Sequence, residues 1–183
     1  LREITGPVIF ISNHQGFADH PSILLSLPSR FRHTTATATW EEFFFEETSN
    51  VIKKIWKRFT YEYAIVFLNL FPFPQQKGFR AALRYMGRLV DHGTSILFFP
   101  EGRHSRDGAI QSFEQGLGII VKELRVPVVP IRIVGSNKVL APGHAIPHRG
   151  EVQVIFGKPL IFKQESPREI VQKSRQAIID LAS

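Results

Sequence analysis

Short, almost continuously apolar runs alternate along the chain with longer stretches in which apolar residues recur every three or four positions. An apolar run bounded by Gly, Pro or Asn predicts a buried strand, and the longer period predicts an amphipathic helix. The predicted strands are residues 7–12, 31–39, 95–99, 128–134 and 152–156. The predicted helices are residues 18–27, 78–92, 113–124 and 167–181.

Proline and glycine residues mark the ends of these helices. Pro28 stops the first helix, and Gly93 is placed as the C-terminal stop of the second. Pro167 falls in the first turn of the last helix, where its missing N–H leaves no helical bond unmade. The positions of these residues therefore agree with the helix ends that the periodicity predicts.

The stretch from Trp40 to Phe73 carries one apolar stripe at helical spacing, with Lys and Arg on much of its other side, and Pro72 and Pro74 end the pattern. Such a stripe suits a membrane interface, and it equally suits a helix packed on a sheet. Core helices carry the same pattern, which favours packing for most of this stretch.

Strands that alternate with helices, and that are apolar on both faces, predict an α/β fold. We expect a single domain built on a twisted, mostly parallel sheet surrounded by helices. Functional sites of such sheets lie in loops beyond the carboxyl ends of the strands. Two loops of this kind are strongly polar, residues 13–20 and residues 101–108.

Composition narrows the class of protein. The chain has 183 residues, which suits one domain, and it has no cysteine. The absence of cysteine excludes a disulfide framework, a cysteine nucleophile and a cysteine-based zinc site, and it leaves a cytosolic or cytosol-facing location as the default. The net charge of +7 favours anionic partners such as phospholipid headgroups or the phosphates of coenzyme A. The alternative is that the excess of Lys and Arg only keeps a basic domain soluble.

No run in the sequence reaches the roughly 20 apolar residues that cross a bilayer. Residues 1–12 also lack the features of a signal peptide. Any membrane contact is therefore expected to be peripheral, on the cytoplasmic side. Because the first residue is Leu1 rather than methionine, we expect residues 1–183 to be one domain of a longer chain.

The first polar loop holds a histidine and a carboxylate five residues apart, His14 and Asp19. An imidazole can take a proton from a hydroxyl near neutral pH, and an aspartate can fix its tautomer and stabilise the imidazolium. The pair works only if His14 lies on the loop and Asp19 in the first helical turn, since a continuous helix would splay them apart. The alternative is that Asn13 and Asp19 cap the helix and His14 is a surface histidine.

The second polar loop runs from Glu101 to Gly108. Gly102 allows close approach of the backbone to an anion, and Arg103 offers a planar fork to phosphate oxygens. Glu101 suits a role in orienting a hydroxyl or in pairing with Arg103. The alternative is an exposed turn with surface ion pairs.

Taken in order, three motifs resemble the glycerolipid acyltransferase superfamily, whose best-known member is lysophosphatidic acid acyltransferase of the PlsC type. They are Asn13-His14-x4-Asp19, Phe99-Pro100-Glu101-Gly102, and the block at residues 126–131, followed by a similar closing segment at residues 150–160. The resemblance covers about residues 7–160, so it identifies the chain as similar to an acyltransferase domain.

The resemblance implies a role for each matching residue. His14 would be the general base that activates an acceptor hydroxyl, and Asp19 would orient it. A larger set would contact or shape the substrate site: Asn13, Glu101, Gly102, Arg103, His104, Ser105, Arg80 and Pro130. The acyl donor would be acyl-coenzyme A or an acyl carrier protein, the acceptor a lysophospholipid or related lipid, and no metal or redox cofactor is expected.

Two departures from the family pattern concern the acceptor. The family usually has Glu-Gly-Thr-Arg-Ser, whereas this chain has Arg103 and His104 at the third and fourth positions. The block that normally ends in an arginine has none at residues 70–75, and we expect Lys77 or Arg80, a few residues on, to substitute. Neither change touches His14 or Asp19, so we expect acyl transfer to be retained, while the identity of the acceptor stays open.

The predicted mechanism is direct transfer, with backbone amides near Gly102 as oxyanion donors. No Gly-x-Ser-x-Gly elbow supports a serine acyl-enzyme. One alternative is a non-catalytic lipid-binding or regulatory domain of the same fold. A nucleic-acid-binding module is suggested by the charge alone and lacks a recognisable motif, so no nucleic-acid partner is expected.

Overall fold

The computed structural model describes residues 1, 4–40, 69–73, 78–105, 108–140 and 148–181. The strands are β1 Ile9–Ser12, β2 Thr35–Trp40, β3 Leu70–Phe73, β4 Ser95–Phe98, β5 Val128–Val134 and β6 Gln153–Phe156. The helices are α1 Asp19–Ser26, α2 Ser29–Arg32, α5 Phe79–Asp91, α6 Gly116–Leu124, α7 Ser136–Val139 and α8 Pro167–Asp180.

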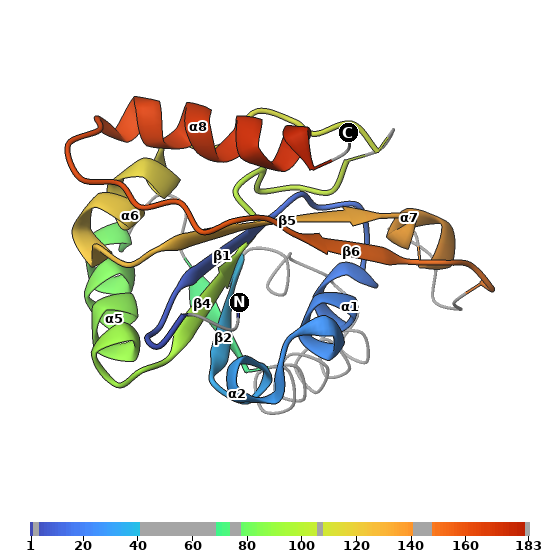
Figure 1. Ribbon diagram of the computed structural model, residues 1–183, viewed down its shortest axis with the longest axis horizontal. Helices are drawn as coiled ribbons and strands as arrows, with labels where there is room; N and C mark the ends of the chain where they lie inside the picture. Colours follow the sequence, from blue (N-terminus) through green and yellow to red (C-terminus); the bar gives the residue numbers. More distant parts are fainter. Residues whose placement is uncertain (2–3, 41–68, 74–77, 106–107, 141–147, 182–183) are drawn as a thin grey trace, which may run out of the picture.

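The strands form one twisted sheet in the order β3-β2-β4-β1-β5-β6 (Figure 1). Every neighbouring pair is parallel except β5 and β6, which are antiparallel. The predicted α/β class and the mostly parallel sheet are therefore confirmed. Parallel strands need a crossover connection. In the described part of the chain, α1 and α2 connect β1 to β2, α5 connects β3 to β4, and α6 connects β4 to β5.

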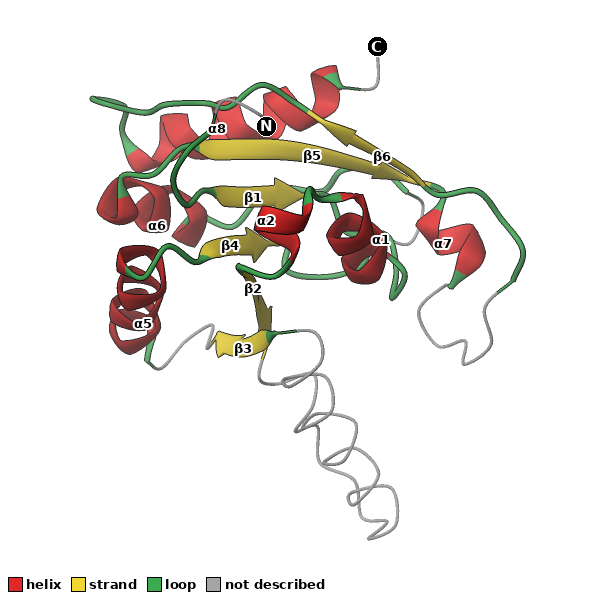
Figure 2. Ribbon diagram, turned by 60° about the horizontal axis from the view of Figure 1, so that its bottom comes forward, coloured by secondary structure: helices red, strands yellow, loops and turns green. Residues whose placement is uncertain are grey.

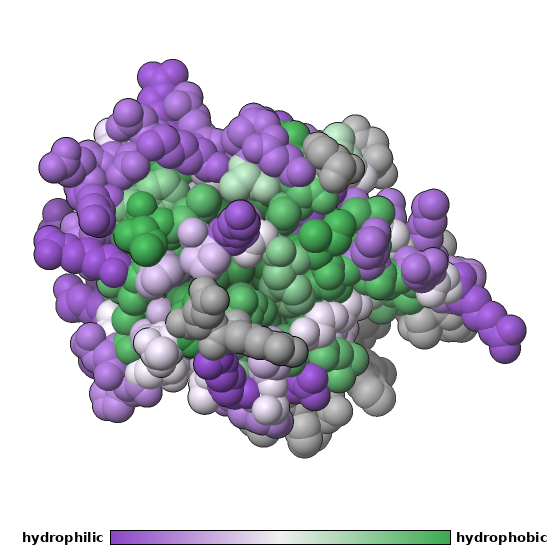
Figure 3. All heavy atoms as spheres, viewed as in Figure 1, coloured by the Kyte–Doolittle hydropathy of each residue, from purple (hydrophilic) through white to green (hydrophobic). Residues whose placement is uncertain are grey.

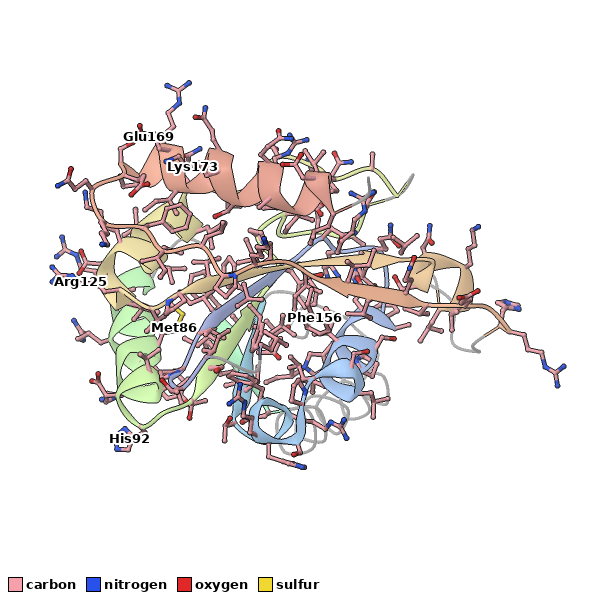
Figure 4. The ribbon with its side chains drawn as sticks, in the orientation of Figure 1. Met86, His92, Arg125, Phe156, Glu169 and Lys173 are labelled. Carbon is pink, nitrogen blue, oxygen red and sulfur yellow. The ribbon has the colours of Figure 1, made fainter. Side chains whose placement is uncertain are left out.

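Helices cover both faces of the sheet. Alternate residues of the central strands point to opposite sides, so each strand packs against helices on both faces. Ile9 and Ile11 of β1 pack with α5, α6 and α8, while Val8 and Phe10 pack with α1 and α2. Met86 points from α5 toward the sheet, whereas His92 at the end of that helix points away from it (Figure 4). The central strands are thus buried on both sides, as their near-continuous apolar runs predict.

The carboxyl ends of β1, β4 and β5 point to the same edge of the sheet, where α1 and α7 also lie (Figure 2). The loop after β1 and the loop after β4 are the two polar loops of the sequence. Because β1 lies between β4 and β5 in the sheet, these loops leave adjacent strands. The fold therefore brings together the two segments that the motifs single out.

Two predicted helix ends are confirmed in detail. After α5, Gly93 has φ +79°, its N–H donates to the carbonyl of Val90, and the N–H of Thr94 donates to that of Leu89. This pair of bonds is the glycine-terminated motif that satisfies carbonyls at a helix C-terminus. At the start of α8, Ser166 and Glu169 form a reciprocal capping box ahead of Pro167. Glu169 and Lys173 lie on the outer side of this helix (Figure 4).

The predicted strand at residues 31–39 begins four residues too early. Phe31 belongs to the short helix α2, where its N–H donates to the carbonyl of Pro28 and its ring packs edge-on against Phe10 at 5.4 Å. The helix predicted from residue 113 likewise begins only at Gly116, because the N–H of Glu114 donates back to Pro100. Local propensity did not show either of these tertiary contacts.

The helical interpretation of the stretch 40–73 is wrong at its end. Residues 70–73 form strand β3, in which Phe71 and Phe73 are buried side by side with β2. Asn69 has φ +48°, a left-handed conformation that interrupts a helix, and its carbonyl accepts the N–H of Thr37. Residues 41–68 lie outside the described residues, so their predicted helix stays a prediction.

Apolar side chains reach the surface across the middle of the face seen in Figure 3, framed by hydrophilic side chains over α8. Partly buried apolar residues pack against the cluster under α1 and α2, namely Leu1, Ile4, Leu24, Phe99, Val152, Val154 and Phe156. Of the helices in the described part of the chain, none has the length and apolar character needed to cross a bilayer.

Candidate active site

His14 and Asp19 meet at the carboxyl end of β1. The strand ends at Ser12, His14 follows on the loop, and Asp19 is the first residue of α1. His14 Nδ1 lies 2.7 Å from Asp19 Oδ2, a hydrogen-bond distance. This is the placement on which the sequence argument depends, with the histidine on the loop and the aspartate in the first helical turn.

Asp19 is held rigidly beneath the loop. Its side chain is fully buried, and its Oδ2 accepts the backbone N–H of Gln15 at 2.6 Å and of Gly16 at 3.0 Å. A carboxylate oxygen that accepts backbone N–H groups has little freedom to move, and these bonds replace the water that Oδ2 loses on burial. Oδ1 is also buried and has no hydrogen-bond partner among the described residues. The oxygen that holds His14 is therefore fixed by the loop that carries His14.

The free edge of the His14 ring faces outward. The side chain of His14 keeps 20% of its surface exposed. Because Nδ1 donates to the carboxylate, the neutral ring carries its lone pair on Nε2, which has no hydrogen-bond partner among the described residues. The geometry thus leaves one basic nitrogen available to an incoming hydroxyl.

The side-chain amide of Asn13 pairs with the backbone of β5. Its Nδ2 donates to the carbonyl of Ile133 at 2.9 Å, and its Oδ1 accepts the N–H of Ile133 at 2.8 Å. The amide of this buried side chain thereby imitates the backbone of a neighbouring strand and ties the first loop to β5. The sequence placed Asn13 among the substrate-binding residues, and the structure shows it shaping the loop.

Glu101 links the two polar loops. It is 3% exposed; its Oε1 accepts the N–H of His14 at 3.1 Å, and its Oε2 accepts the N–H of Gln111 at 3.1 Å. The link is completed by the N–H of Ser105, which donates to the carbonyl of His14 at 2.7 Å. Burial raises the pKa of Glu101, while the two backbone N–H groups oppose that rise.

Of the residues that follow Glu101 in the second loop, His104 contacts the His14 ring. Gly102 has φ +70° and donates its N–H to Phe99 at 3.1 Å, so this amide already has an acceptor. Arg103 is exposed. The ring centroid of His104 lies 3.9 Å from that of His14, and burial, together with the neighbouring His14, lowers the pKa of His104 to about 4.

Two of the predicted substrate-binding residues lie on other elements. Arg80 is exposed in the first turn of α5. Pro130 is buried in β5, where its carbonyl accepts the N–H of Gly157 at 2.8 Å. A Cβ added at Gly157 would lie 2.7 Å from Pro130 Cγ, so the structure shows Pro130 packing against the segment after β6.

Gln15 is a site residue that the sequence analysis did not single out. Its Nε2 donates to the carbonyl of Gly108 at 3.3 Å, and its Oε1 accepts the N–H of Gly135 at 3.1 Å. This one side chain therefore joins the loop after β1 to the loops after β4 and β5. Its position inside the first motif was the only sequence signal, since both partners are far away in the chain.

His20, next to Asp19, was also missed. Its Nε2 lies 2.8 Å from the hydroxyl of Thr37 on β2. Burial, together with the neighbouring His14, lowers the pKa of His20 to about 4. At neutral pH, His20 is therefore an uncharged neighbour of the His14–Asp19 pair.

The buried state of His20 gives a testable pH dependence of stability. An unfolded histidine takes a proton near 6.5, while folded His20 stays neutral down to about 4, so acidification through this window favours unfolding. From pH 7 to pH 4, we expect the free energy of unfolding of wild type to fall by about 3 kcal/mol more than that of His20→Gln. Urea denaturation measures both, with exposed His33→Gln as the control. Parallel curves for wild type and His20→Gln would contradict this.

A family model described as Acyltransferase matches residues 2–134 of the chain. A chloroplastic 1-acyl-sn-glycerol-3-phosphate acyltransferase of Brassica napus is 31% identical over 84% of this chain and 41% of its own length. A probable enzyme of the same name from Mycoplasma genitalium is 25% identical over 95% of this chain and 65% of its own.

A solved structure shares the fold. The crystal structure of the 1-acyl-sn-glycerophosphate acyltransferase PlsC from Thermotoga maritima aligns with a TM-score of 0.70 and 24% identity, covering 98% of this chain and 68% of that one. The chain spans about two fifths of the length of the Brassica napus relative and of a chloroplastic enzyme of the same name from Arabidopsis thaliana.

Proposed function

The chain belongs to the Acyltransferase family, and from that premise we propose that it transfers a fatty acyl group from a thioester to the hydroxyl of a lysophospholipid. The observation that carries the proposal is the 2.7 Å contact between His14 Nδ1 and the buried Asp19 carboxylate. The names of the relatives, which specify 1-acyl-sn-glycerol-3-phosphate as the acceptor, support the same substrate class.

In the proposed reaction, His14 Nε2 takes the proton of the acceptor hydroxyl. The hydroxyl oxygen then bonds to the thioester carbonyl carbon, the carbon–sulfur bond breaks, and the sulfur leaves with the electron pair. The proton held on Nε2 passes to the departing thiolate, which restores neutral His14. Asp19 acts by keeping the lone pair on Nε2 and by stabilising the imidazolium that forms in between.

Backbone amides of the second loop are the proposed oxyanion donors. Gly102 N–H donates to Phe99, whereas the amides of Arg103 and His104 have no acceptor among the described residues. These two amides are therefore the better candidates to meet the negative charge on the carbonyl oxygen. Glu101 contributes by fixing the loop that presents them.

We also propose the acyl donor, the location of the protein and the residues that contact the acceptor. The donor is acyl-coenzyme A or an acyl carrier protein, and the net charge of +7 suits a peripheral position on the cytoplasmic side of an anionic membrane. Acceptor contacts are assigned to Arg103, Ser105 and the exposed Arg80, with Pro130 supporting the strand beneath. The proposed chemistry requires no metal or redox cofactor.

The test supplies labelled palmitoyl-coenzyme A with 1-acyl-glycerol 3-phosphate, lysophosphatidylcholine or glycerol 3-phosphate as acceptor, and follows free thiol together with labelled lipid. We expect thiol release that depends on a lysophospholipid and yields an equal amount of diacyl product. A lipid-binding domain without catalysis would bind the acceptor and release no thiol. That outcome would overturn the proposal.

A further inference from the structure

Two aromatic rings contact the imidazole of His14. The ring centroid of Phe99 lies 4.3 Å from that of His14 with 23° between the planes, and the centroid of His104 lies 3.9 Å away with 40° between the planes. No ring contact joins Phe99 to His104 in the part of the chain that the structure describes. The two rings therefore meet the imidazole from different sides.

These ring contacts restrict the rotation of the imidazole, which the hydrogen bond to Asp19 alone does not. A single bond at Nδ1 fixes one edge of the imidazole but leaves the ring free to swing about that edge. Neighbours on both sides remove this freedom and keep Nε2 aimed in one direction. Phe17 contacts His104 edge-on, with its ring centroid 5.1 Å from that of His104.

The charged groups around this stack define its electrostatics. The Asp19 carboxylate lies at the edge of the His14 ring, and Glu101 accepts the backbone N–H of His14. His20 and His104 both have a pKa lowered to about 4, first by burial and then by His14, so neither adds a charge near neutral pH. Arg103, the neighbouring cation, is exposed to solvent.

We propose that His104 is a positioning residue, which holds the plane of His14 by stacking and, by remaining uncharged, lets His14 take up a proton. The role of that proton in acyl transfer rests on the proposed function; the stacking and the charge effect do not. A cation in the same place, about 4 Å from the imidazolium, would repel it. Protonation of His14 would then require a pH lower by about one unit. A neutral ring attracts the imidazolium through its electron-rich face.

Three variants separate stacking from charge. His104→Phe keeps a neutral ring, His104→Arg keeps a planar group and adds a charge, and His104→Ala removes both ring and charge. Exposed His33→Gln serves as the control for expression and pH handling. Circular dichroism and urea denaturation verify that each variant folds before it is compared.

The first readout is independent of activity. Proton NMR of the His14 ring gives the pH at which it titrates. We expect His104→Arg to titrate about one pH unit lower than wild type, and His104→Phe to titrate within about 0.3 units of it. Equal titration of wild type and His104→Arg would overturn the charge effect, whether or not the protein transfers acyl groups.

The second readout is kcat and KM across pH. We expect the acid limb of kcat/KM in His104→Arg to move to lower pH along with the NMR titration. In His104→Ala we expect kcat to fall roughly tenfold with little change in KM, and His104→Phe to restore most of that loss. A full kcat in His104→Ala would overturn the positioning role. Absence of transfer in wild type would instead overturn the proposed function and leave the NMR result standing.

Discussion

Replacing His14 with alanine is expected to lower kcat/KM for acyl transfer by about 10³-fold, because general base catalysis of this kind contributes 10²–10⁴-fold. His14 Nε2 has no hydrogen-bond partner among the residues that the structure describes, and Asp19 holds the opposite edge of the ring at 2.7 Å. Steady-state thiol release at pH 7.5 measures the loss. KM for the lipid should change little, since the imidazole acts on the reacting hydroxyl rather than on the body of the lipid.

The matched control for this substitution is His33→Ala, which removes an exposed histidine at the end of α2. It should leave kcat/KM within about twofold of wild type, as surface substitutions away from special features do. If His14→Ala loses less than tenfold while the control is unchanged, His14 is not the general base.

The largest effect on folding is expected at the crossing of α6 and α8. A Cβ placed on Gly118 would lie 2.1 Å from the carbonyl oxygen of Pro167 and 2.7 Å from its Cα. Both atoms are backbone at the first turn of α8, so α8 has to shift as a body. We expect Gly118→Ala to lower the free energy of unfolding by about 3 kcal/mol. Urea denaturation followed by circular dichroism measures the change.

Gly87 provides a matched control in the neighbouring helix α5. Among the described residues, a Cβ there meets only the flexible side chain of Leu124, at 4.0 Å. Since alanine is the better helix former, Gly87→Ala should be neutral or stabilising by up to about 1 kcal/mol. Equal effects of the two substitutions would show that the close approach of α8 to Gly118 does not constrain the fold.

The sequence could predict the parts of this fold that depend on neighbouring residues. The apolar run 7–12, the polar loop after it and the helix behind it follow from local pattern, and so does the stop at Gly93. The His14–Asp19 geometry is equally local, because it requires only a loop followed by a helical start. These expectations are confirmed.

The segments that the sequence could not predict are decided by distant contacts. Leu70 continues an apolar pattern that suits a helix, yet residues 70–73 pair with β2 as a strand because the sheet offers them an edge. Phe31 has strand propensity but packs against Phe10 from the short helix α2. Short apolar segments are ambiguous in period, and only the partner resolves them.

In the site, too, some features follow from the local sequence and others depend on distant contacts. Its titratable pair was visible in the sequence, whereas the residues that hold it were not. Gln15 bonds Gly108 and Gly135, and Glu101 bonds the backbone of His14 from another loop. His20 could be recognised as buried only once β2 was placed beside α1. These supporting contacts join residues that are distant in the chain, so no spacing in the sequence predicts them.

The most direct test of the account is a double-mutant cycle on His14 and Asp19, measured as kcat/KM for acyl transfer. If Asp19 acts through His14, Asp19→Asn should cost about 10²-fold in the wild-type protein and nothing further in His14→Ala. The carboxylate would then matter only as the group that orients and charges the imidazole. An equal loss from Asp19→Asn in both backgrounds would contradict the claim that the two residues form one catalytic unit.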